Sequence, residues 1–282
     1  MIKTAKQLKD KTRNLSGGNS NKAQTLIRNY MMERFLERIT LSKYRNNFIL
    51  KGGMLVAAMV GIETRATMDI DTTVKALPLT PDRTRAIVDE ILAVEINDGV
   101  HFSISKESSI MEEHDYPGLR YILNATLERI QEIIKIDIST GDIMTPSAIE
   151  YSYKLMFEDR RISLWTYNLE TVLGEKLETM MARGTANTRM RDFYDVFVLY
   201  RQEKDTLNVE NLIAAFNATS AKRSTTALIP DFALILEEVR NSSEMQKNWE
   251  NYRSNNYYVE DLSWDDVMRA VMELTQILTV RN

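Results

Sequence analysis

The stretch FILKGGMLVAAMVGIETRATMDIDTTV, residues 48–74, constrains the fold more than any other part of this chain. A short apolar run of the strand type leads into Gly52 and Gly53, an apolar run of the helix type follows, and ATMDIDTTV then alternates in the manner of a strand. Side chains two residues apart in a strand point to the same face, so Asp69 and Asp71 project together, about 6.5–7 Å apart along the chain. Their mutual repulsion predicts that something positive lies between them.

A second apolar stretch, KIDIS at residues 135–139, repeats this alternation. Its two isoleucines are predicted to face inward, while Asp137 faces the opposite way. Met68 and Ile70 are likewise predicted to point into the core behind the first pair of aspartates. If the two strands pair, three carboxylates converge on one patch.

Three carboxylates without a histidine suit a hard cation such as Mg²⁺, which prefers oxygen ligands. Two such ions about 3.5–4 Å apart activate an attacking hydroxyl and stabilise a leaving oxygen in phosphoryl-type transfer. A strand–Gly-Gly–helix turn fits the same chemistry, because its backbone N–H groups and the helix N-terminus approach a phosphate closely.

Each of these pieces has a plainer interpretation when it stands alone. A D-x-D pair often ends a strand with solvated carboxylates, and a glycine pair is usually only a turn. The order strand, Gly-Gly, helix, D-x-D strand and later Asp-bearing strand favours the interpretation as a metal and phosphate site.

Composition narrows the chemistry further. The chain has 282 residues, no cysteine and two histidines, His101 and His114, which excludes disulfides, thiolate chemistry and a histidine-rich metal site. We find no apolar run near the length of about 20 residues that a membrane helix needs. The basic start has no apolar core of the secretory type. These features predict a cytoplasmic protein that does not enter a membrane.

Charge is distributed unevenly along the chain. Residues 1–51 contain twelve Lys and Arg against three Asp and Glu, whereas the remainder is acidic. Such asymmetry indicates either a segment that binds a polyanion or an ordinary solvated helix face, and charge alone leaves both open. In KAQTLIRNYMMERFLERI, Ile27, Met31, Phe35 and Ile39 recur every four residues and give one apolar helix face, with Arg34 and Arg38 on another.

The order of predicted elements gives the fold class. Helices are expected up to about residue 45, strands alternate with helices to residue 167, and the chain from NLETVLGEKLETMMARG onward is expected to be helical. A helix is also expected with Thr80 as its N-cap and Pro81 at its first position. This predicts an α+β domain over residues 1–168, with a mixed sheet, and a helical domain over residues 169–282.

The motifs in this order resemble those of the nucleotidyltransferase superfamily whose core is similar to that of DNA polymerase β. More closely, the chain resembles the AbiEii family, the toxins of bacterial type IV toxin–antitoxin and abortive-infection (phage-defence) systems. The first family motif, GG followed by R-x-[ST]-x-D-h-D, matches at Gly52, Gly53, Arg65, Thr67, Asp69 and Asp71. The second matches KIDIS and gives Asp137 as the third carboxylate.

Two further motifs match in the helical part. The third is a helix with an essential lysine, here Lys176, and the fourth is R-x-[KR]-D-h-x-D, with Arg189, Arg191, Asp192 and Asp195. Either aspartate of the fourth motif fits the functional position, and Asp192 is the first choice because it directly follows a basic residue. The plainer alternatives are a solvated lysine on a charged helix face and a local ion pair of Arg191 with Asp192.

The resemblance implies an Mg²⁺-dependent nucleotidyltransferase toxin that moves NMP from an NTP to an RNA acceptor, with the tRNA 3′ end as the expected target, and so blocks translation and growth. It implies catalytic roles for Asp69, Asp71, Asp137, Lys176 and Asp192, of which Asp69, Asp71 and Asp137 hold two metal ions. It implies nucleotide binding by Gly52, Gly53, Arg65, Thr67, Lys176 and Asp195.

The resemblance also implies an antitoxin encoded nearby that acts without a stable complex. Two alternatives stay open: nucleotidylation or phosphorylation of a protein, and a non-catalytic nucleotide-binding module. The intact carboxylate set argues against the second of these.

Overall fold

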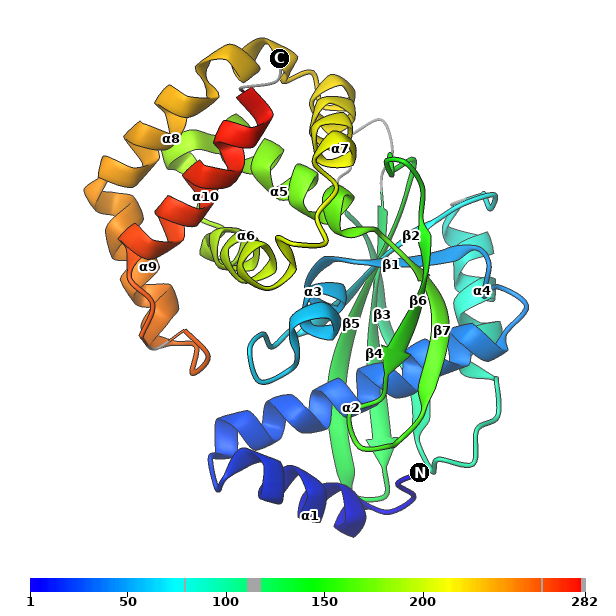
Figure 1. Ribbon diagram of the computed structural model, residues 1–282. Helices are drawn as coiled ribbons and strands as arrows, with labels where there is room; N and C mark the ends of the chain where they lie inside the picture. The colour runs from blue at the N-terminus through cyan, green and yellow to red at the C-terminus, as the bar shows by residue number, and fades with distance from the viewer. Residues whose placement is uncertain (79, 111–117, 260, 280–282) are drawn as a thin grey trace. The chain divides into compact units, whose positions relative to one another are not determined.

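The computed structural model describes residues 1–78, 80–110, 118–259 and 261–279, which leaves His114 outside the described residues. The chain divides into two compact units (Figure 1). Unit 1 comprises Met1–Ala58, Ala66–Asp142 and Ile149–Thr166, and unit 2 comprises Met59–Arg65, Ile143–Ala148 and Tyr167–Asn282. The ranges predicted from the sequence, 1–168 and 169–282, differ from this division because two short segments of the N-terminal part belong to unit 2.

Unit 1 begins with two helices and then alternates strands and helices. Its helices are α1 (Ala5–Ser16), α2 (Ser20–Leu41), α3 (Gly52–Val60, whose last two residues belong to unit 2) and α4 (Pro81–Leu92). Its strands are β1 (Phe48–Lys51), β2 (Asp69–Val74), β3 (His101–Ile110), β4 (Gly118–Leu127), β5 (Ile130–Thr140), β6 (Ile149–Lys154) and β7 (Arg161–Thr166).

The strands described here form one mixed sheet in the order β3-β4-β5-β2-β1-β7-β6. β2 pairs in parallel with β5, and β1 in parallel with β7, while the other neighbours are antiparallel. The helix α2 lies along the sheet and contacts β5 and β7. The sheet confirms the predicted α+β class, and it confirms that the strands carrying Asp71 and Asp137 pair.

The long helix α2 supplies much of the core of unit 1. Its predicted apolar face is confirmed, since Ile27, Met31, Phe35 and Ile39 are all buried. The two arginines predicted on another face are also buried, because internal carboxylates neutralise them. Arg34 bonds to Glu37 at 2.6 Å, and Arg38 forms a two-pronged pair with Asp98 at 2.8 and 3.1 Å.

These ion pairs show which basic residues of the N-terminal segment are not available to bind a polyanion. Arg34 and Arg38 hold the unit together from inside, so they do not belong to a polyanion-binding surface. Five exposed basic side chains of residues 1–51 lie on and just before α1: Lys3, Lys6, Lys9, Lys11 and Arg13. We call these five residues the α1 basic surface. Lys43 is also exposed, but it pairs with Glu90.

Unit 2 is helical, as the sequence predicts. Its helices are α5 (Leu169–Arg183), α6 (Met190–Glu203), α7 (Val209–Lys222), α8 (Phe232–Asn241), α9 (Ser243–Ser254) and α10 (Trp264–Thr279), with 3₁₀ turns at Gly184–Ala186 and Thr226–Asp231. α5 packs against α6 and α7, and α10 packs against α6 and α8. Within the described ranges, no helix is both long and apolar enough to cross a bilayer.

The buried Glu33 on α2 predicts a pH dependence of stability. Burial raises its pKa to about 8, although the carboxylate accepts hydrogen bonds from the Met156 amide and the Tyr153 hydroxyl. The unfolded carboxyl loses its proton near pH 4.5, so the folded state binds the extra proton between these values. The stability from this group is therefore complete below the unfolded pKa and is lost as pH rises through about 8.

We expect Glu33→Gln, which keeps the shape and stays neutral, to flatten the fall in unfolding free energy between these pH values. Urea unfolding of both proteins across this range measures the difference. Parallel curves for the two proteins would contradict the assignment.

Candidate active site

The first two motifs bring three aspartates to one face of the sheet in unit 1. Asp69 and Asp71 lie two apart on β2, and Asp71 is directly opposite Asp137 on the parallel strand β5. Neighbouring strands lie about 4.8 Å apart, so the backbone places Asp71 and Asp137 close together. Behind them Ile70, Ile136 and Ile138 are buried, as predicted. The predicted alternation of the two strands is therefore confirmed, and the pairing on which the convergence of the carboxylates depended is present.

Met68 is an exception to that prediction. Its side chain is 60% exposed rather than part of the core. The reason is that β2 begins at Asp69, so Met68 precedes the strand and does not follow its alternation.

Asp69 and Asp137 each pair with a cation from a neighbouring strand. Lys135, opposite Asp69 in the β2–β5 register, bonds to it at 2.6 Å. Arg120, opposite Asp137 in the β4–β5 register, bonds to it through two nitrogens at 2.7 Å each. The hydrogen bond to Asp137 is the main cause of a raised pKa of Arg120, and the charges of Asp69 and Asp71 act in the same direction.

Arg120 was missed by the sequence analysis. Its only sequence signal is a charged residue inside the apolar strand GLRYILNATL. Among the residues that the structure describes, no group of three or more His, Asp or Glu side chains is arranged to hold a metal ion.

Gly52 makes room for Asp71 at the start of α3. Its φ is +66°, and a Cβ built on it would lie 2.1 Å from an oxygen of Asp71. Both the backbone conformation and the missing side chain therefore require glycine at this position. Gly53 is the second residue of α3. The predicted strand–Gly-Gly–helix turn is present, and it lies directly against one of the three carboxylates.

The first motif is divided between the two units after Arg65. Thr67 belongs to unit 1, where its hydroxyl lies 3.2 Å from a carboxylate oxygen of Asp69 and donates to it. Arg65 belongs to unit 2 and is buried there. Its guanidinium bonds to Asp195 of α6, with the shortest distance 2.6 Å from Nε.

Lys176 of α5 meets both aspartates of the fourth motif. Its ammonium lies 2.6 Å from Asp192 and 2.8 Å from Asp195, and all three side chains are largely buried. Burial alone would lower the pKa of Lys176, but the two carboxylates outweigh it and raise the pKa. Lys176 is thus no solvated surface lysine, and Asp192 pairs with it rather than with Arg191.

The resulting network, Arg65–Asp195–Lys176–Asp192, alternates in sign, and the half-exposed Arg189 lies 4.0 Å from Asp192 at its end. Burial would raise the pKa of Asp195, but Arg65 and Lys176 outweigh it and hold the pKa below its ordinary value. The helix α5 that carries Lys176 is fixed at its start by Asn168, whose side chain accepts from the Thr171 amide at 2.7 Å and donates to the Thr145 carbonyl. Of the two candidate aspartates, Asp195 is held more closely, because two cations lie within 2.8 Å of it, whereas Asp192 has Lys176 at 2.6 Å and Arg189 only at 4.0 Å.

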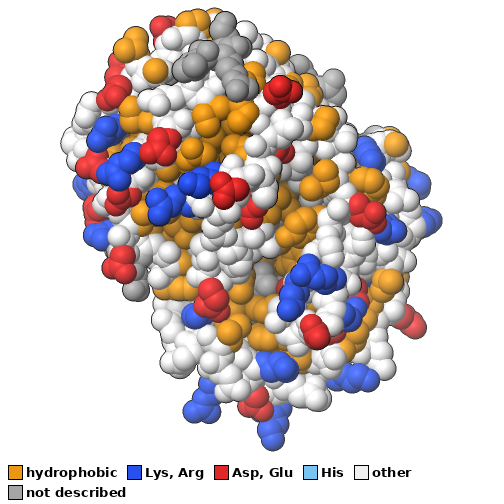
Figure 2. Space-filling view, viewed as in Figure 1, with side chains coloured by type: hydrophobic (Ala, Val, Ile, Leu, Met, Phe, Trp, Pro, Cys, Tyr) orange, Lys and Arg blue, Asp and Glu red, His pale blue; other side chains and the backbone are white. Residues whose placement is uncertain are grey.

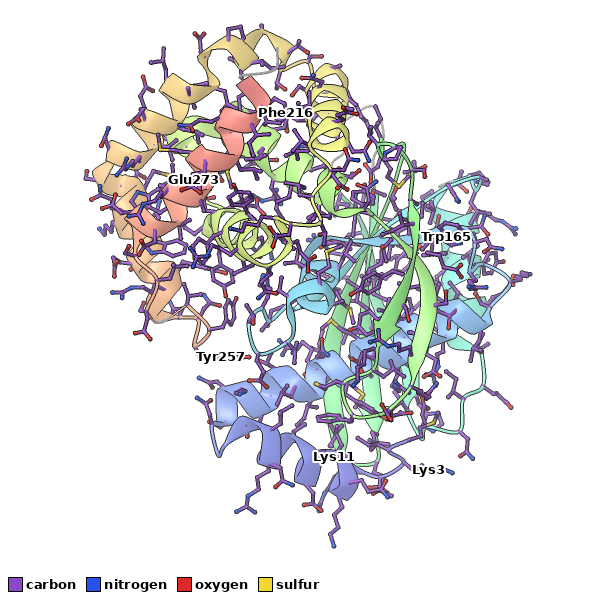
Figure 3. The ribbon with its side chains drawn as sticks, viewed as in Figure 1. Lys3, Lys11, Trp165, Phe216, Tyr257 and Glu273 are labelled. Atoms are coloured by element: carbon purple, nitrogen blue, oxygen red, sulfur yellow. The ribbon has the colours of Figure 1, made fainter. Side chains whose placement is uncertain are left out.

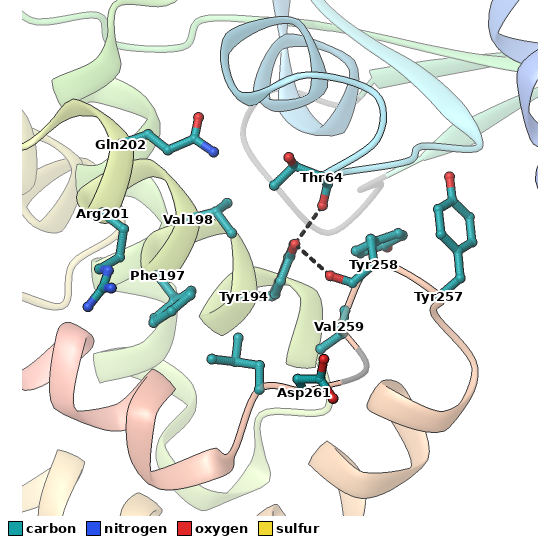
Figure 4. A pocket seen from close by; sticks show the side chains of 11 residues that line it. Thr64, Tyr194, Phe197, Val198, Arg201, Gln202, Tyr257, Tyr258, Val259 and Asp261 are labelled. Carbon is teal, nitrogen blue, oxygen red and sulfur yellow. Dashed lines mark hydrogen bonds between the residues drawn. The ribbon is translucent and has the colours of Figure 1, made fainter. Parts of the chain in front are cut away.

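Unit 2 also contains a cavity of about 470 Å³ beside this network (Figure 4). Tyr194, the neighbour of Asp195, lines it, and its hydroxyl donates to the Thr64 carbonyl at 2.5 Å. Tyr257 and Tyr258 line the same cavity, whereas Trp264 is buried against Phe193 and Trp249.

Substitution of Gly52 tests the close approach of Asp71. We expect Gly52→Ala to combine backbone strain with a clash against Asp71 and to lower the free energy of unfolding by about 3 kcal/mol or more. Gly17→Ala is the matched control, because Gly17 has a similar φ of +59° but open space around it. The control should cost only about 1–2 kcal/mol. Equal losses in urea unfolding would contradict the clash.

Removal of Asp195 tests the buried network. We expect Asp195→Ala to destabilise the protein by about 3–5 kcal/mol, because Arg65 stays buried without its partner. Asp192→Ala should cost less, about 1–3 kcal/mol, since Lys176 keeps Asp195. Thermal and urea unfolding of both variants measure the difference. A greater loss in Asp192→Ala would reverse this ranking.

Two solved structures have a fold similar to that of this chain. JHP933 from Helicobacter pylori has a similar structure, with TM-score 0.54, 13% identity and coverage of 92% of this chain and 93% of that one. A second H. pylori structure, of a candidate nucleotidyltransferase, gives TM-score 0.53, 13% identity and coverage of 92% and 96%. At such identity these likenesses show the fold alone. None of the curated proteins compared with the sequence matches it.

A family model decides the identity. The model described as "Nucleotidyl transferase AbiEii toxin, Type IV TA system" matches residues 34–270, which is most of the chain and includes all four motifs. The resemblance noted in the sequence is therefore confirmed. This chain belongs to the AbiEii family of nucleotidyltransferase toxins of type IV toxin–antitoxin systems.

Proposed function

We propose that this nucleotidyltransferase moves a nucleoside monophosphate from an NTP to a hydroxyl of an RNA acceptor, with the 3′ end of tRNA as the expected target. Modification of that end would block translation and bacterial growth. The observation that carries the proposal is the placement of Asp69, Asp71 and Asp137 on one sheet face in a chain of this family.

The donor set on this face fits Mg²⁺. Three carboxylates at neighbouring register positions offer only oxygen ligands, and Gly52 leaves the space that the Asp71 carboxylate occupies. We assign Asp69, Asp71 and Asp137 as the residues that would hold two ions. Mg²⁺ bound there would offset the charge of the triphosphate and of the leaving pyrophosphate.

The chain's own groups then have separate roles. A carboxylate oxygen of Asp137 would accept the proton of the attacking hydroxyl. The backbone N–H groups of Gly52 and Gly53, at the N-terminus of α3, would bind phosphate oxygens. The family motifs imply that Lys176 and Arg65 bind the triphosphate. To do so, each would have to give up its bond to Asp195 and donate to phosphate oxygens instead. Their binding to nucleotide stays a prediction.

The α1 basic surface supports a nucleic-acid acceptor. All five of its side chains are exposed, and Lys6, Lys9 and Arg13 share one helix face at spacings of three and four residues. None of the five forms an ion pair with another of the described residues. Figure 2 shows such basic side chains projecting at the end where α1 lies in Figure 1, and Figure 3 labels Lys3 and Lys11 of this surface. Free cations of this kind neutralise backbone phosphates.

We further propose that a cognate antitoxin, encoded nearby, counteracts the enzyme without a stable complex. Transfer to a protein side chain, and nucleotide binding without transfer, are the competing functions. These functions can be told apart by the molecule that becomes labelled when the enzyme is given a labelled nucleotide: tRNA, protein or neither.

The purified protein, incubated with Mg²⁺, each α-labelled NTP in turn, total tRNA and a protein lysate, should label tRNA. The label should disappear in Asp71→Asn, which keeps the shape of the side chain but removes its charge. Label on protein alone would contradict the RNA acceptor. No label on any acceptor, with retained nucleotide binding, would indicate the non-catalytic module.

The double variant Lys6→Gln/Lys9→Gln provides a second arm of this experiment. It should weaken tRNA binding and reduce the slope of log affinity against log salt by about one to two, since two phosphate contacts are lost. Lys204→Gln/Lys247→Gln, which removes two exposed charges from unit 2, is the matched control.

A further inference from the structure

Charged side chains cross the sheet of unit 1 in a single row. Arg120 on β4, Asp137 on β5, Asp71 on β2 and Lys51 on β1 are successive partners in the strand register. Two carboxylates thus lie side by side in the middle, with a cation at each end. Because the backbone register fixes these neighbours, the order of charges does not depend on how any one side chain is rotated.

The two cations at the ends of this row, Lys51 and Arg120, make different contacts. Lys51 bonds to the Ser139 hydroxyl at 2.9 Å and to Asp142. Arg120, in contrast, places two nitrogens on the two oxygens of Asp137. Lys135, two residues before Asp137 on β5, bonds to a single carboxylate oxygen of Asp69 at 2.6 Å.

We propose that Arg120 and Lys135 are resident counter-cations of the metal-binding carboxylates, which compete with the divalent cation for Asp137 and Asp69 and so set its affinity. This inference rests on the proposed function, because it takes these carboxylates as the metal ligands. It assigns Arg120 and Lys135 as positioning residues, which act on the metal only through the aspartates.

The competition follows from charge and geometry. Both oxygens of Asp137 accept from one guanidinium, and a divalent ion at either oxygen would be repelled by the positive charge about 3–5 Å away. Metal binding therefore requires each cation to leave its aspartate. In return, the cations keep three neighbouring carboxylates from repelling one another before the metal binds.

The partial exposure of Arg120 and Lys135 lowers the free energy needed to replace them with a metal ion. The side chains of Arg120 and Lys135 are 36% and 32% exposed, so each can turn to water at little cost. Arg65 in its pair with Asp195 is 3% exposed and could leave only as an unpaired buried charge. The two kinds of Arg–Asp pair are thus suited to different tasks: the buried one fixes structure, and the exposed one yields to a competitor. Once displaced, Arg120 and Lys135 remain beside the ion as donors for phosphate oxygens.

Titration of the full chain with Mn²⁺, followed by the electron paramagnetic resonance of free Mn²⁺ and without any nucleotide, tests the inference. Arg120→Gln and Lys135→Gln should each tighten Mn²⁺ binding by about three- to tenfold, because each removes one competing charge. Arg120→Lys keeps the charge but loses the two-nitrogen contact with Asp137. Its Mn²⁺ affinity should lie between those of Arg120→Gln and the unchanged protein. Arg129→Gln is the matched control: it removes an equal charge from the same hairpin, but at its far turn.

The outcomes separate this inference from the proposed function. If Asp71→Asn abolishes Mn²⁺ binding while Arg120→Gln binds no tighter than the unchanged protein, the metal site stands and the competition is refuted. Equal tightening in Arg129→Gln would also refute it, since the effect would then come from net charge alone. If Asp71→Asn binds Mn²⁺ as the unchanged protein does, the metal site fails and the inference fails with it.

Discussion

The register between β2 and β5 is the constraint on which the candidate site depends. It places Asp71 opposite Asp137 and Asp69 opposite Lys135, so two like charges become direct neighbours on one sheet face. Such a placement is unfavourable in a sheet unless cations offset it. The β4–β5 register supplies Arg120 beside Asp137, and the β2–β5 register itself supplies Lys135 beside Asp69. The charged face is therefore a property of strand pairing and not of isolated side chains.

The helical unit also contains neighbouring carboxylates, but there they and their cations are buried. Asp195 is fully buried between Arg65 and Lys176, and Asp192 pairs with Lys176. Here the charges are withdrawn from water and must keep their partners, because a single unpaired buried charge is costly. In the sheet the pairs are partly exposed and exchangeable. Ion pairs of the same residue types thus stay fixed in the helical unit and can be exchanged in the sheet.

Local patterns predicted the parts of the site that depend on neighbouring residues in sequence. The strand alternation of MDIDTTV and KIDIS places Asp69, Asp71 and Asp137, and the turn at Gly52 follows from the glycine pair. Met68 was misplaced because the alternation was extended one residue beyond the start of the strand. Patterns could not reveal the partner of each charge, since Arg65 and Asp195 lie 130 residues apart. Nor could they separate the buried Arg34 and Arg38 from the exposed cations of α1, which depends on where Glu37 and Asp98 lie in the fold.

We propose the three aspartates of the sheet as the metal ligands of this nucleotidyltransferase. Crystals grown with Mn²⁺ and a non-hydrolysable NTP analogue allow the most direct test, because Mn²⁺ is located by its anomalous scattering. We expect anomalous peaks within about 2.5 Å of carboxylate oxygens of Asp69, Asp71 and Asp137, with the triphosphate beside Gly52. A peak ligated by other residues, with these three aspartates still bonded to Arg120 and Lys135, would contradict it.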